Sequence, residues 1–339
     1  MIFEITSRNE WTSIVESVDS YDVYHTFDYH DLTVTDPDRS ILLVYIEKEA
    51  IVAIPLIYRP IPGTDLFDAT SVYGYAGPVS TGVTANFDTQ KMSNEMAAHF
   101  KEKNIVSVFS RLNPYITNQA DILENLGGLN TAGQIVGIDL TMNAEQQRVR
   151  FACRLKTQLN HLRRSTSVRE GASEADFELF FEIYTESMNR LNAADQYYFS
   201  LEYFKKLFTS NQIGAKLLLA ECETTGEVMA GSIFFVSNDI VQYHLSGTFN
   251  KFMDRMPSKL LIDEMRLRCT DTRLLHLNLG GGLGCNNDGL FRFKKSFSPS
   301  VRSFILWRYI VDQKAYKYLV KKNGSEKLNE NFVFPEYRL

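Results

Sequence analysis

The sequence has few cysteines, four in 339 residues, and no two of them form a Cys-x-x-Cys pair. Zinc ribbons and thiol–disulfide active sites are therefore not indicated. No apolar run approaches the roughly 18 residues that a membrane-spanning helix requires. The N-terminus carries acidic and polar side chains where a secretion signal has positive charge and then an apolar core. These absences predict a cytoplasmic protein with no transmembrane segment and no bound metal.

Charge is unevenly distributed along the chain, whose net charge is −5. Residues 1–150 hold 10 Lys and Arg against 20 Asp and Glu, whereas residues 151–339 hold 26 against 21. This asymmetry predicts that the second half receives an anionic ligand, and coenzyme A and tRNA are both anionic. The length predicts two domains, which we place at residues 1–150 and 151–339.

The first half predicts a β-rich unit. Two apolar runs at 41–46 and 51–57 are separated by a short polar turn, which indicates a hairpin. A third strand is predicted over 66–75 and a fourth over 105–110. Between them, Met92, Met96 and Phe100 recur at helical spacing within a helix predicted over 89–103.

The second half opens with a helix predicted over 151–170, because apolar residues recur at helical spacing and Gly171 follows as a stop. Its basic face is either the solvated side of a connector or a docking surface for phosphate or tRNA; it carries Arg154, Lys156, Arg163, Arg164 and Arg169. Helices over 177–190, 201–209, 258–269 and 311–320 and strands over 215–222, 228–236, 240–246, 274–279 and 304–309 complete the pattern. The recurring order predicts two copies of one α/β unit.

The most distinctive segment is residues 276–297, HLNLGGGLGCNNDGLFRFKKSF. A buried strand leads into a glycine-rich bend and then into an amphipathic turn whose phenylalanines surround Lys294 and Lys295. Four glycines in five positions allow positive φ angles and the close approach of another molecule.

This segment resembles the "L-G-G-G … D-G-L-F-x-F-K-x-x-F" signature of the Fem family. Four more segments resemble the family in the same order along the chain: SVYGYAGPVS at 71–80, FSRLNPY at 109–115, YTESMNRLNAADQYYF at 184–199 and YHLSGT at 243–248. The family comprises bacterial transferases that add amino acids to peptidoglycan precursors, together with relatives encoded among surface-polysaccharide genes. All are similar to GNAT N-acyltransferases.

The resemblance implies an α/β fold of two tandem GNAT-like domains, each a mixed central sheet flanked by helices, with the acceptor on the first and the acyl donor on the second. We expect transfer of acetyl from acetyl-CoA to the amine of an amino sugar or sugar nucleotide for a bacterial surface polysaccharide. One alternative is an aminoacyl-tRNA-dependent transferase acting on a peptidoglycan precursor; another is a non-catalytic GNAT-fold binding protein. The sequence lacks the long helical arm of many tRNA-dependent Fem enzymes, which favours acetyl-CoA. DNA is not expected as a partner.

Two residues of the glycine-rich segment match the family's site. Lys294 is implied to contact the acceptor or to stabilise developing negative charge, although a lysine between phenylalanines also fits a packed turn. Asp288 is implied to orient Lys294 or to accept a proton, and it equally fits a helix N-cap. Strand alternation places His244 on one face with Gln242 and Ser246, and Tyr243 on the other. His244 is a candidate proton acceptor, and His276 is expected to face the same cleft.

The remaining candidates bind substrate or donor. Arg190 matches a family arginine that would grip a phosphate or carboxylate. Four residues match positions that the family uses in the acceptor cleft: Tyr73, Tyr75, Arg111 and Asn113. Acetyl-CoA enzymes carry a Q/R-x-x-G-x-G/A pattern before the helix that receives the pyrophosphate, and residues 247–259 lack it. We expect phosphates to be bound there by charge, through Lys251, Arg255 and Lys259.

Overall fold

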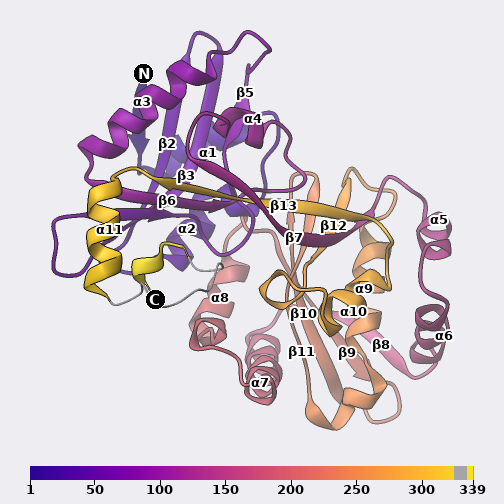
Figure 1. Ribbon diagram of the computed structural model, residues 1–339. Helices are drawn as coiled ribbons and strands as arrows, with labels where there is room; N and C mark the ends of the chain where they lie inside the picture. Colours follow the sequence, from indigo (N-terminus) through magenta and orange to yellow (C-terminus); the bar gives the residue numbers. More distant parts are fainter. Residues whose placement is uncertain (324–333, 339) are drawn as a thin grey trace. The chain divides into compact units, whose positions relative to one another are not determined.

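The computed structural model describes residues 1–323 and 334–338, and the chain forms two compact units. Unit 1 comprises residues 1–132 and 303–339, and unit 2 comprises residues 133–302. Figure 1 shows the helices and strands of each unit. Among the described residues, no helix is both long enough and apolar enough to cross a membrane.

Unit 1 is built on a sheet with the strand order β1-β2-β3-β4-β6-β13, and β5 pairs with β3. Neighbouring strands are antiparallel except β4 and β6, which are parallel. The strands are β1 (Ile2–Ile5), β2 (Arg39–Glu47), β3 (Ala50–Pro60), β4 (Phe67–Thr70), β5 (Val79–Thr81), β6 (Ile105–Arg111) and β13 (Val301–Ile310). The helices are α1 (Arg8–Ser17), η1 (Val23–His25), α2 (Phe27–Thr33), α3 (Thr89–Glu102), α4 (Gln119–Leu123), α11 (Gln313–Lys322) and η6 (Glu336–Arg338).

Alternation along β2 determines how the layers of unit 1 pack. Odd positions such as Leu43 pack in one cluster with Met96 of α3, whereas even positions such as Leu42 pack with Trp11 of α1. Because successive side chains of a strand point to opposite faces, α3 and α1 cover opposite faces of this sheet. The helical stripe predicted for α3 is confirmed, since Met92, Met96 and Phe100 are fully buried.

Unit 2 has the strand order β7-β12-β11-β10-β9-β8. Its strands are β7 (Gly128–Asp139), β8 (Thr166–Gly171), β9 (Ala215–Cys222), β10 (Val228–Ser237), β11 (Ile240–Thr248) and β12 (His276–Gly280). Its helices are α5 (Ala144–Val149), α6 (Cys153–Leu162), α7 (Glu174–Leu191), η2 (Asp195–Tyr197), α8 (Leu201–Thr209), η3 (Asn250–Arg255), α9 (Ser258–Cys269), η4 (Leu283–Cys285) and α10 (Gly289–Lys295). Only β11 and β12 pair in parallel. Leu218 and Phe234 pack with Leu261 of α9, while Gly231, on the other face, approaches Phe180 of α7.

The two units repeat one pattern of strand directions. Each has four antiparallel strands, a crossover helix (α3 or α9), a strand parallel to the fourth, and a last antiparallel strand. The last strand of each sheet comes from the other end of the chain order. The strand that follows the first sheet in sequence, β7, pairs with β12 of unit 2, and the strand that follows the second sheet, β13, pairs with β6 of unit 1. This exchange moves the limits of the compact units to 132/133 and 302/303, away from the boundary at 150/151 that the sequence suggests. A predicted α/β fold with internal duplication is confirmed.

The helix predicted over 151–170 is shorter than expected. Helix α6 ends at Leu162, and residues 166–171 form strand β8 instead. The helical spacing of apolar residues stops at Leu162, after which Thr166 and Val168 alternate as in a strand. Arg169 therefore lies on β8, where it pairs with Asp176 at 2.7 Å and with Glu221 at 2.5 Å. The strand predicted over 66–75 is also shorter, and β7 was not predicted.

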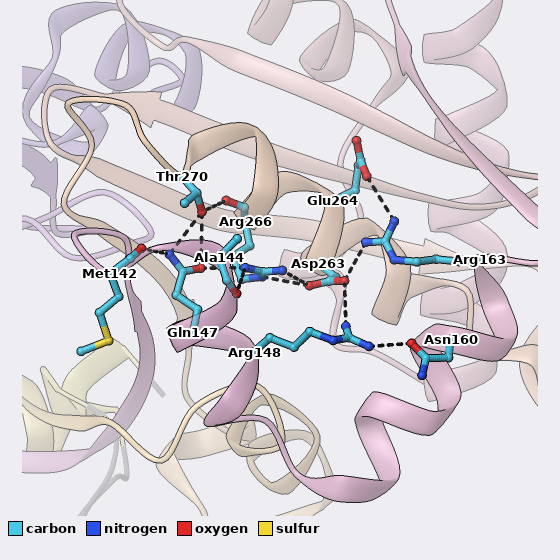
Figure 2. A network of polar contacts seen from close by, with 10 residues as sticks. All are labelled: Met142, Ala144, Gln147, Arg148, Asn160, Arg163, Asp263, Glu264, Arg266 and Thr270. Carbon is cyan, nitrogen blue, oxygen red and sulfur yellow. Dashed lines mark hydrogen bonds and ion pairs between the residues drawn. The ribbon is translucent and has the colours of Figure 1, made fainter.

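A buried charge network joins α5 and α6 to α9 (Figure 2). The Asp263 carboxylate is fully buried and accepts hydrogen bonds from Nη2 and Nε of Arg266 at 2.7 and 2.9 Å. Arg163, which follows α6, donates to the other carboxylate oxygen at 2.7 Å. Arg266 is 1% exposed and also donates to Gln147 of α5 at 2.9 Å. Two helices that precede β8 are thus fixed to the crossover helix of unit 2.

Removing one partner of this network is expected to be costly. Asp263→Ala should lower the free energy of unfolding by about 3–5 kcal/mol, because the Arg266 guanidinium would stay buried without a counterion. The double variant Asp263→Leu/Arg266→Met should lose less than Asp263→Ala alone, since no fully buried charge is left unpaired and Arg163 is partly exposed. Urea denaturation measures both. As a control, Glu202→Ala removes an exposed ion pair with Lys206 and should cost under about 1 kcal/mol. A double variant that loses as much stability as Asp263→Ala and Arg266→Met lose together would contradict this view.

Candidate functional site

The parallel strands of unit 2 part after a short contact. Pairing between β11 and β12 covers Ile240–Gln242 and His276–Asn278, whereas β11 continues to Thr248 and β12 to Gly280. At the last paired position, Asn278 Nδ2 donates to Gln242 Oε1 at 2.8 Å. Beyond this amide pair the two strands separate, and β12 runs into the glycine-rich bend.

A strip of polar side chains lies on the face of this sheet that α7 and α8 cover. His276 and Asn278 share a face of β12, and Gln242 and His244 lie on the same face of β11. His244 Nε2 is 3.2 Å from the hydroxyl of Tyr203 on α8, and its ring stacks 4.1 Å from that of Phe235. Burial lowers the pKa of His244 to about 3 and also lowers that of His276. Both imidazoles are therefore neutral at physiological pH.

The opposite face carries a cluster of hydroxyl groups at the same point of the sheet. The register between β10 and β11 shifts at His244, so Tyr243 and Ser246 share a face. The Tyr243 hydroxyl is hydrogen-bonded to Ser246 and Ser232, whose oxygens lie 2.8 Å apart. Burial raises the pKa of Tyr243, and the phenol keeps its proton. The predicted placement of Ser246 beside His244 is wrong, because a β-bulge interrupts the alternation.

The glycine-rich bend is held by Asp288. Its Oδ1 accepts from the amide of Phe291 at 2.8 Å and caps α10, and its Oδ2 accepts from the amide of Leu283 at 3.0 Å. A Cβ at Gly282 would lie 2.4 Å from Asp288 Oδ1 and 2.1 Å from the carbonyl oxygen of Asn286, so this position requires glycine. The N-cap interpretation of Asp288 is confirmed. These backbone hydrogen bonds hold its pKa below the usual value.

Lys294 lies beneath the same bend. Its side chain is directed inward, the residue is 8% exposed, and Nζ donates to the carbonyl of Gly281 at 2.7 Å. Burial lowers its pKa to about 8, an effect that the Asp288 charge partly opposes. Phe291 and Phe297 of the surrounding segment are buried in the core of unit 2. Lys294 and Asp288 thus contact opposite ends of one bend, and Lys294 has the burial of a packed residue together with the perturbed pKa of a functional one.

Arg190 ends α7 beside the end of β11. Its Nη1 donates to the carbonyl of Thr248 at 3.1 Å and to the side chain of Asn250, and its Nη2 donates to Ser187 at 3.2 Å. These contacts join the helix to the strand where β11 leaves the sheet. A phosphate or carboxylate at Arg190, as the sequence suggests, would have to share the guanidinium with them.

The three cations expected to bind a pyrophosphate lie in the segment after β11 and already have partners. Lys251 Nζ donates to Glu227 at 2.6 Å, and Lys259 Nζ donates to Gln158 at 2.7 Å. Arg255 contacts the sulfur of Cys222 at 3.3 Å and lies over the ring of Phe252. Each of the three side chains thus contacts a different neighbouring residue. Their binding of phosphates stays a prediction.

The four candidates of the first half lie in unit 1. Tyr73 is 50% exposed, whereas the ring of Tyr75 packs edge-on against Phe304. Arg111 lies over the ring of Phe109. Asn113 is buried, and its amide group donates to Asp22 and to the backbone of residue 75. Asn113 therefore supports the chain around it, while Tyr73 is the exposed member of the set.

Several polar residues near these sites had no sequence signal. Ser232 lies in an apolar strand, and Gln119 and Asp22 lie in segments that the sequence left unassigned. A buried hydrogen-bonded side chain has the same sequence appearance as an exposed one, so only the fold identifies these residues. The hydrogen bond between Gln242 and Asn278 could not be predicted without the strand register. Each residue lies two positions from a candidate histidine, however, and this spacing places it on the same face of its strand.

The FemAB family model matches residues 221–320, which contain the parting strands and the glycine-rich bend. Among solved structures, the chain is similar to FemX with a TM-score of 0.71 and 12% identity over 94% of this chain and 99% of that chain. It is also similar to the C-terminal domain of a putative lysylphosphatidylglycerol synthetase from Agrobacterium fabrum (TM-score 0.57, 11% identity, 93% and 95% covered). A tandem GNAT protein of clavulanic acid biosynthesis gives a TM-score of 0.52 at 8% identity, with 92% and 98% covered.

At these identities the structural likeness establishes the fold alone. Curated protein sequences show no match to this chain. The family model and the tandem GNAT fold together confirm the predicted resemblance to Fem-like tandem GNAT proteins.

Asp288 allows capping to be separated from charge. Asp288→Ala should lower the free energy of unfolding by about 1 kcal/mol, because α10 loses its N-cap, and turnover should fall as the bend loosens. Asp288→Asn retains Oδ1 as the acceptor for Phe291 but loses the acceptor for the Leu283 amide, so it should keep the cap and lose only part of the stability and turnover. Urea denaturation and initial rates on the same preparations provide the comparison. Equal losses in activity for both variants would instead assign the function of the bend to the second carboxylate oxygen and its charge rather than to the cap.

Proposed function

We propose that this protein transfers an aminoacyl group from an aminoacyl-tRNA to an amine of a peptidoglycan precursor. The observation that carries the proposal is the match of residues 221–320 to the FemAB family model, because that segment contains both the parting strands and Lys294. The resemblance implies this donor and this class of acceptor. The proposal departs from the acetyl transfer that the sequence first favours.

The chemistry requires a neutral amine, a polarised carbonyl and a stabilised leaving group. The amine nitrogen attacks the ester carbonyl carbon, and negative charge develops on the carbonyl oxygen. When the intermediate collapses, the bond to the ribose oxygen breaks, that oxygen takes the electron pair, and a proton released by the amine neutralises it. The new bond is an amide. No oxidant, reductant or metal is needed for this balance.

The parting of β11 and β12 supports a place for the carbonyl. Past Gln242, the ladder between these strands has ended, and we assign a backbone N–H on this side of β11 to polarise the acyl oxygen. Tyr243 follows directly, and its phenol can pass its proton to the leaving oxygen and take the proton released by the amine in return. His244 is neutral and bonded to Tyr203, which suits it to orient the acceptor amine. In unit 1, Tyr73 and Arg111 are the residues we assign to the acceptor.

Lys294 is assigned to the developing negative charge. A buried ammonium acts in a low dielectric, where its interaction with an oxyanion is stronger than in water. Its bond to Gly281 also fixes the bend through which β12 leaves the sheet. The tetrahedral intermediate therefore forms beside a cation that needs no reorientation.

A second candidate is acetyl transfer from acetyl-CoA to an amino sugar or sugar nucleotide. The observation that favours it is the set of three cations that follow β11, Lys251, Arg255 and Lys259, at the crossover to α9 where a GNAT domain receives a pyrophosphate. Helix α7, with 18 residues, is the longest of the described helices, and the helical arm of many tRNA-dependent relatives is not among them. The donor experiment below decides between the two.

The donor is identified by thermal denaturation with three additions: charged tRNA, uncharged tRNA and acetyl-CoA. A donor at about 100 times its dissociation constant should add about 2.7 kcal/mol and raise the midpoint by several degrees. We expect the rise with tRNA, and turnover of a peptidoglycan precursor only with charged tRNA. A rise with acetyl-CoA alone would support the acetyl candidate. No shift and no turnover with any donor would leave a GNAT-fold binding protein.

The pH dependence of turnover tests Lys294. If the cation stabilises the transition state, kcat should fall as pH rises through about 8, the pKa of Lys294. Lys294→Arg should remove this descending limb, because a guanidinium stays charged. Lys294→Met keeps the buried stem and removes the charge, and kcat should fall about 10²–10³-fold. A folded Lys294→Met protein with full turnover would assign Lys294 to packing alone.

A further inference from the structure

Residues 71–78, here called the tyrosine loop, follow β4 in unit 1. The amide of Ser71 still bonds to Phe109 of β6 at 3.0 Å, and a single parallel bridge then joins Ala76 to Leu112. Between these points the chain leaves the sheet. The loop therefore begins where the parallel strands of unit 1 part, at the position that corresponds to the parting of β11 and β12 in unit 2.

Gln119, the first residue of α4, holds this loop with all its amide atoms. Nε2 donates to the carbonyls of Ala76 and Pro78, both at 2.8 Å, and Oε1 accepts from the amide of Asn113 at 2.6 Å. The residue is 3% exposed. A buried amide with three hydrogen bonds is stabilised only if the backbone of the loop stays in place, since a lost partner leaves a buried polar group unsatisfied.

Asn113 holds the preceding carbonyl. Its Nδ2 donates to the carbonyl of Tyr75 at 3.1 Å and to the carboxylate of Asp22 at 2.8 Å. Asp22 is fully buried, and its other oxygen accepts from the amide of Val23. Asp22 thus fixes the side chain of Asn113, which in turn fixes the loop.

Close packing leaves the loop no alternative path. A Cβ at Gly74 would lie 2.2 Å from the ring of Tyr24, and one at Gly77 would lie 2.8 Å from Gln119. The amide of Gly77 donates to Ser110 at 3.1 Å, and the hydroxyl of Tyr29 donates to the carbonyl of Tyr73 at 3.0 Å. The Tyr73 ring itself is 50% exposed on this fixed backbone.

We propose that Gln119 and Asn113 are positioning residues that fix the backbone of the tyrosine loop and thereby present the Tyr73 ring to the sugar of the acceptor. The inference rests on the proposed function, because it concerns how that acceptor is bound. An aromatic ring on a rigid loop provides contact area at low cost in conformational entropy. The predicted contact of Asn113 with the acceptor is replaced by an indirect role.

Gln119→Glu tests the proposal with almost no change of shape. The acceptor oxygen for Asn113 remains, but an oxygen replaces the nitrogen that faces two carbonyls. We expect KM for the acceptor to rise about tenfold or more, since small misplacements of a binding group are costly. Affinity for the donor should be unchanged. Gln90→Glu, which makes the same charge change at an exposed position of α3, is the matched control and should behave as wild type.

A double-mutant cycle with Tyr73→Ala separates positioning from general stability. If Gln119 acts through Tyr73, the Gln119→Glu substitution should have little further effect on KM in the Tyr73→Ala background. Additive effects on KM would overturn the proposal. A Gln119→Glu variant that retains wild-type KM would also overturn it.

The swap Asp22→Asn/Asn113→Asp tests the other anchor without removing its buried partner. The hydrogen bond between positions 22 and 113 is kept in reverse, but a carboxylate oxygen at position 113 would now face the Tyr75 carbonyl. KM for the acceptor should rise as in Gln119→Glu, while affinity for the donor stays unchanged. Wild-type KM in a folded swap variant would remove Asn113 from the proposal.

Hydrogen exchange keeps this test independent of the acceptor's identity. In Gln119→Glu, the amides of residues 74–77 should exchange at least tenfold faster than in wild type, with β2 and β3 unaffected. Unchanged protection of the loop would overturn the positioning role. If wild type transfers no acyl group to any acceptor but the loop amides respond as expected, the proposed function fails while the anchoring of the loop stands.

Discussion

The structure of the candidate site depends on how short the parallel contact between β11 and β12 is. Three residues of each strand pair, and then the ladder ends. A strand whose backbone groups lose their neighbour must be given other partners, because an unsatisfied buried N–H or C=O costs about as much as a lost hydrogen bond. The features around the point where β11 and β12 part provide such partners. Asn278 and Gln242 close the paired part with side-chain amides, and the glycine-rich bend turns β12 away.

The bend is stabilised from both ends by charge. Asp288 accepts two backbone amides, and Lys294 donates to one carbonyl. Charge-assisted hydrogen bonds of this kind are roughly twice as strong as neutral ones. The same contacts explain why the site residues of this segment have double roles. The Lys294 ammonium is buried and holds the backbone of Gly281, so a packing role and the chemical role that we propose are compatible for this residue.

Many helices and strands could be predicted from the sequence, since the distribution of apolar residues along the chain indicates where each element lies. The limits of α8, α9 and β9 agree with those expected, because serine, proline or glycine precedes each apolar segment and polar residues follow it. Prediction failed where the spacing of apolar residues fitted both a helix and a strand, or where strand pairing depended on residues distant in sequence. Residues 166–171 continue a basic segment but form a strand, since β9 offers them a partner. The exchange of β7 and β13 leaves no trace in the periodicity of either strand, and the domain limits shifted with it.

The candidate site was predictable as a set of segments, and its side-chain geometry was not. The family signature located Lys294, Asp288 and the tyrosine loop, but not whether each side chain faces in or out. Asn113 faces inward because Asp22, distant in sequence, provides a buried acceptor. A one-residue bulge at His244 moves Ser246 to the other face. Both outcomes depend on contacts between segments far apart in the chain.

In both units a parallel pair of strands parts, and the side chains that lie at this point differ between the two units. This difference bears on the functions that we propose for them. In unit 2 the strands part around a cation and a phenol, groups suited to charge that develops during a reaction. In unit 1 the strands part around the side-chain amides of Gln119 and Asn113, which bind the loop backbone and the buried Asp22 carboxylate, and a half-exposed tyrosine lies on the loop that they hold. These amides offer no charge to a transition state, but they hold the backbone of the loop in place. The proposed division of the reaction, with the chemical step in unit 2 and acceptor binding in unit 1, agrees with this difference between the two places where the strands part.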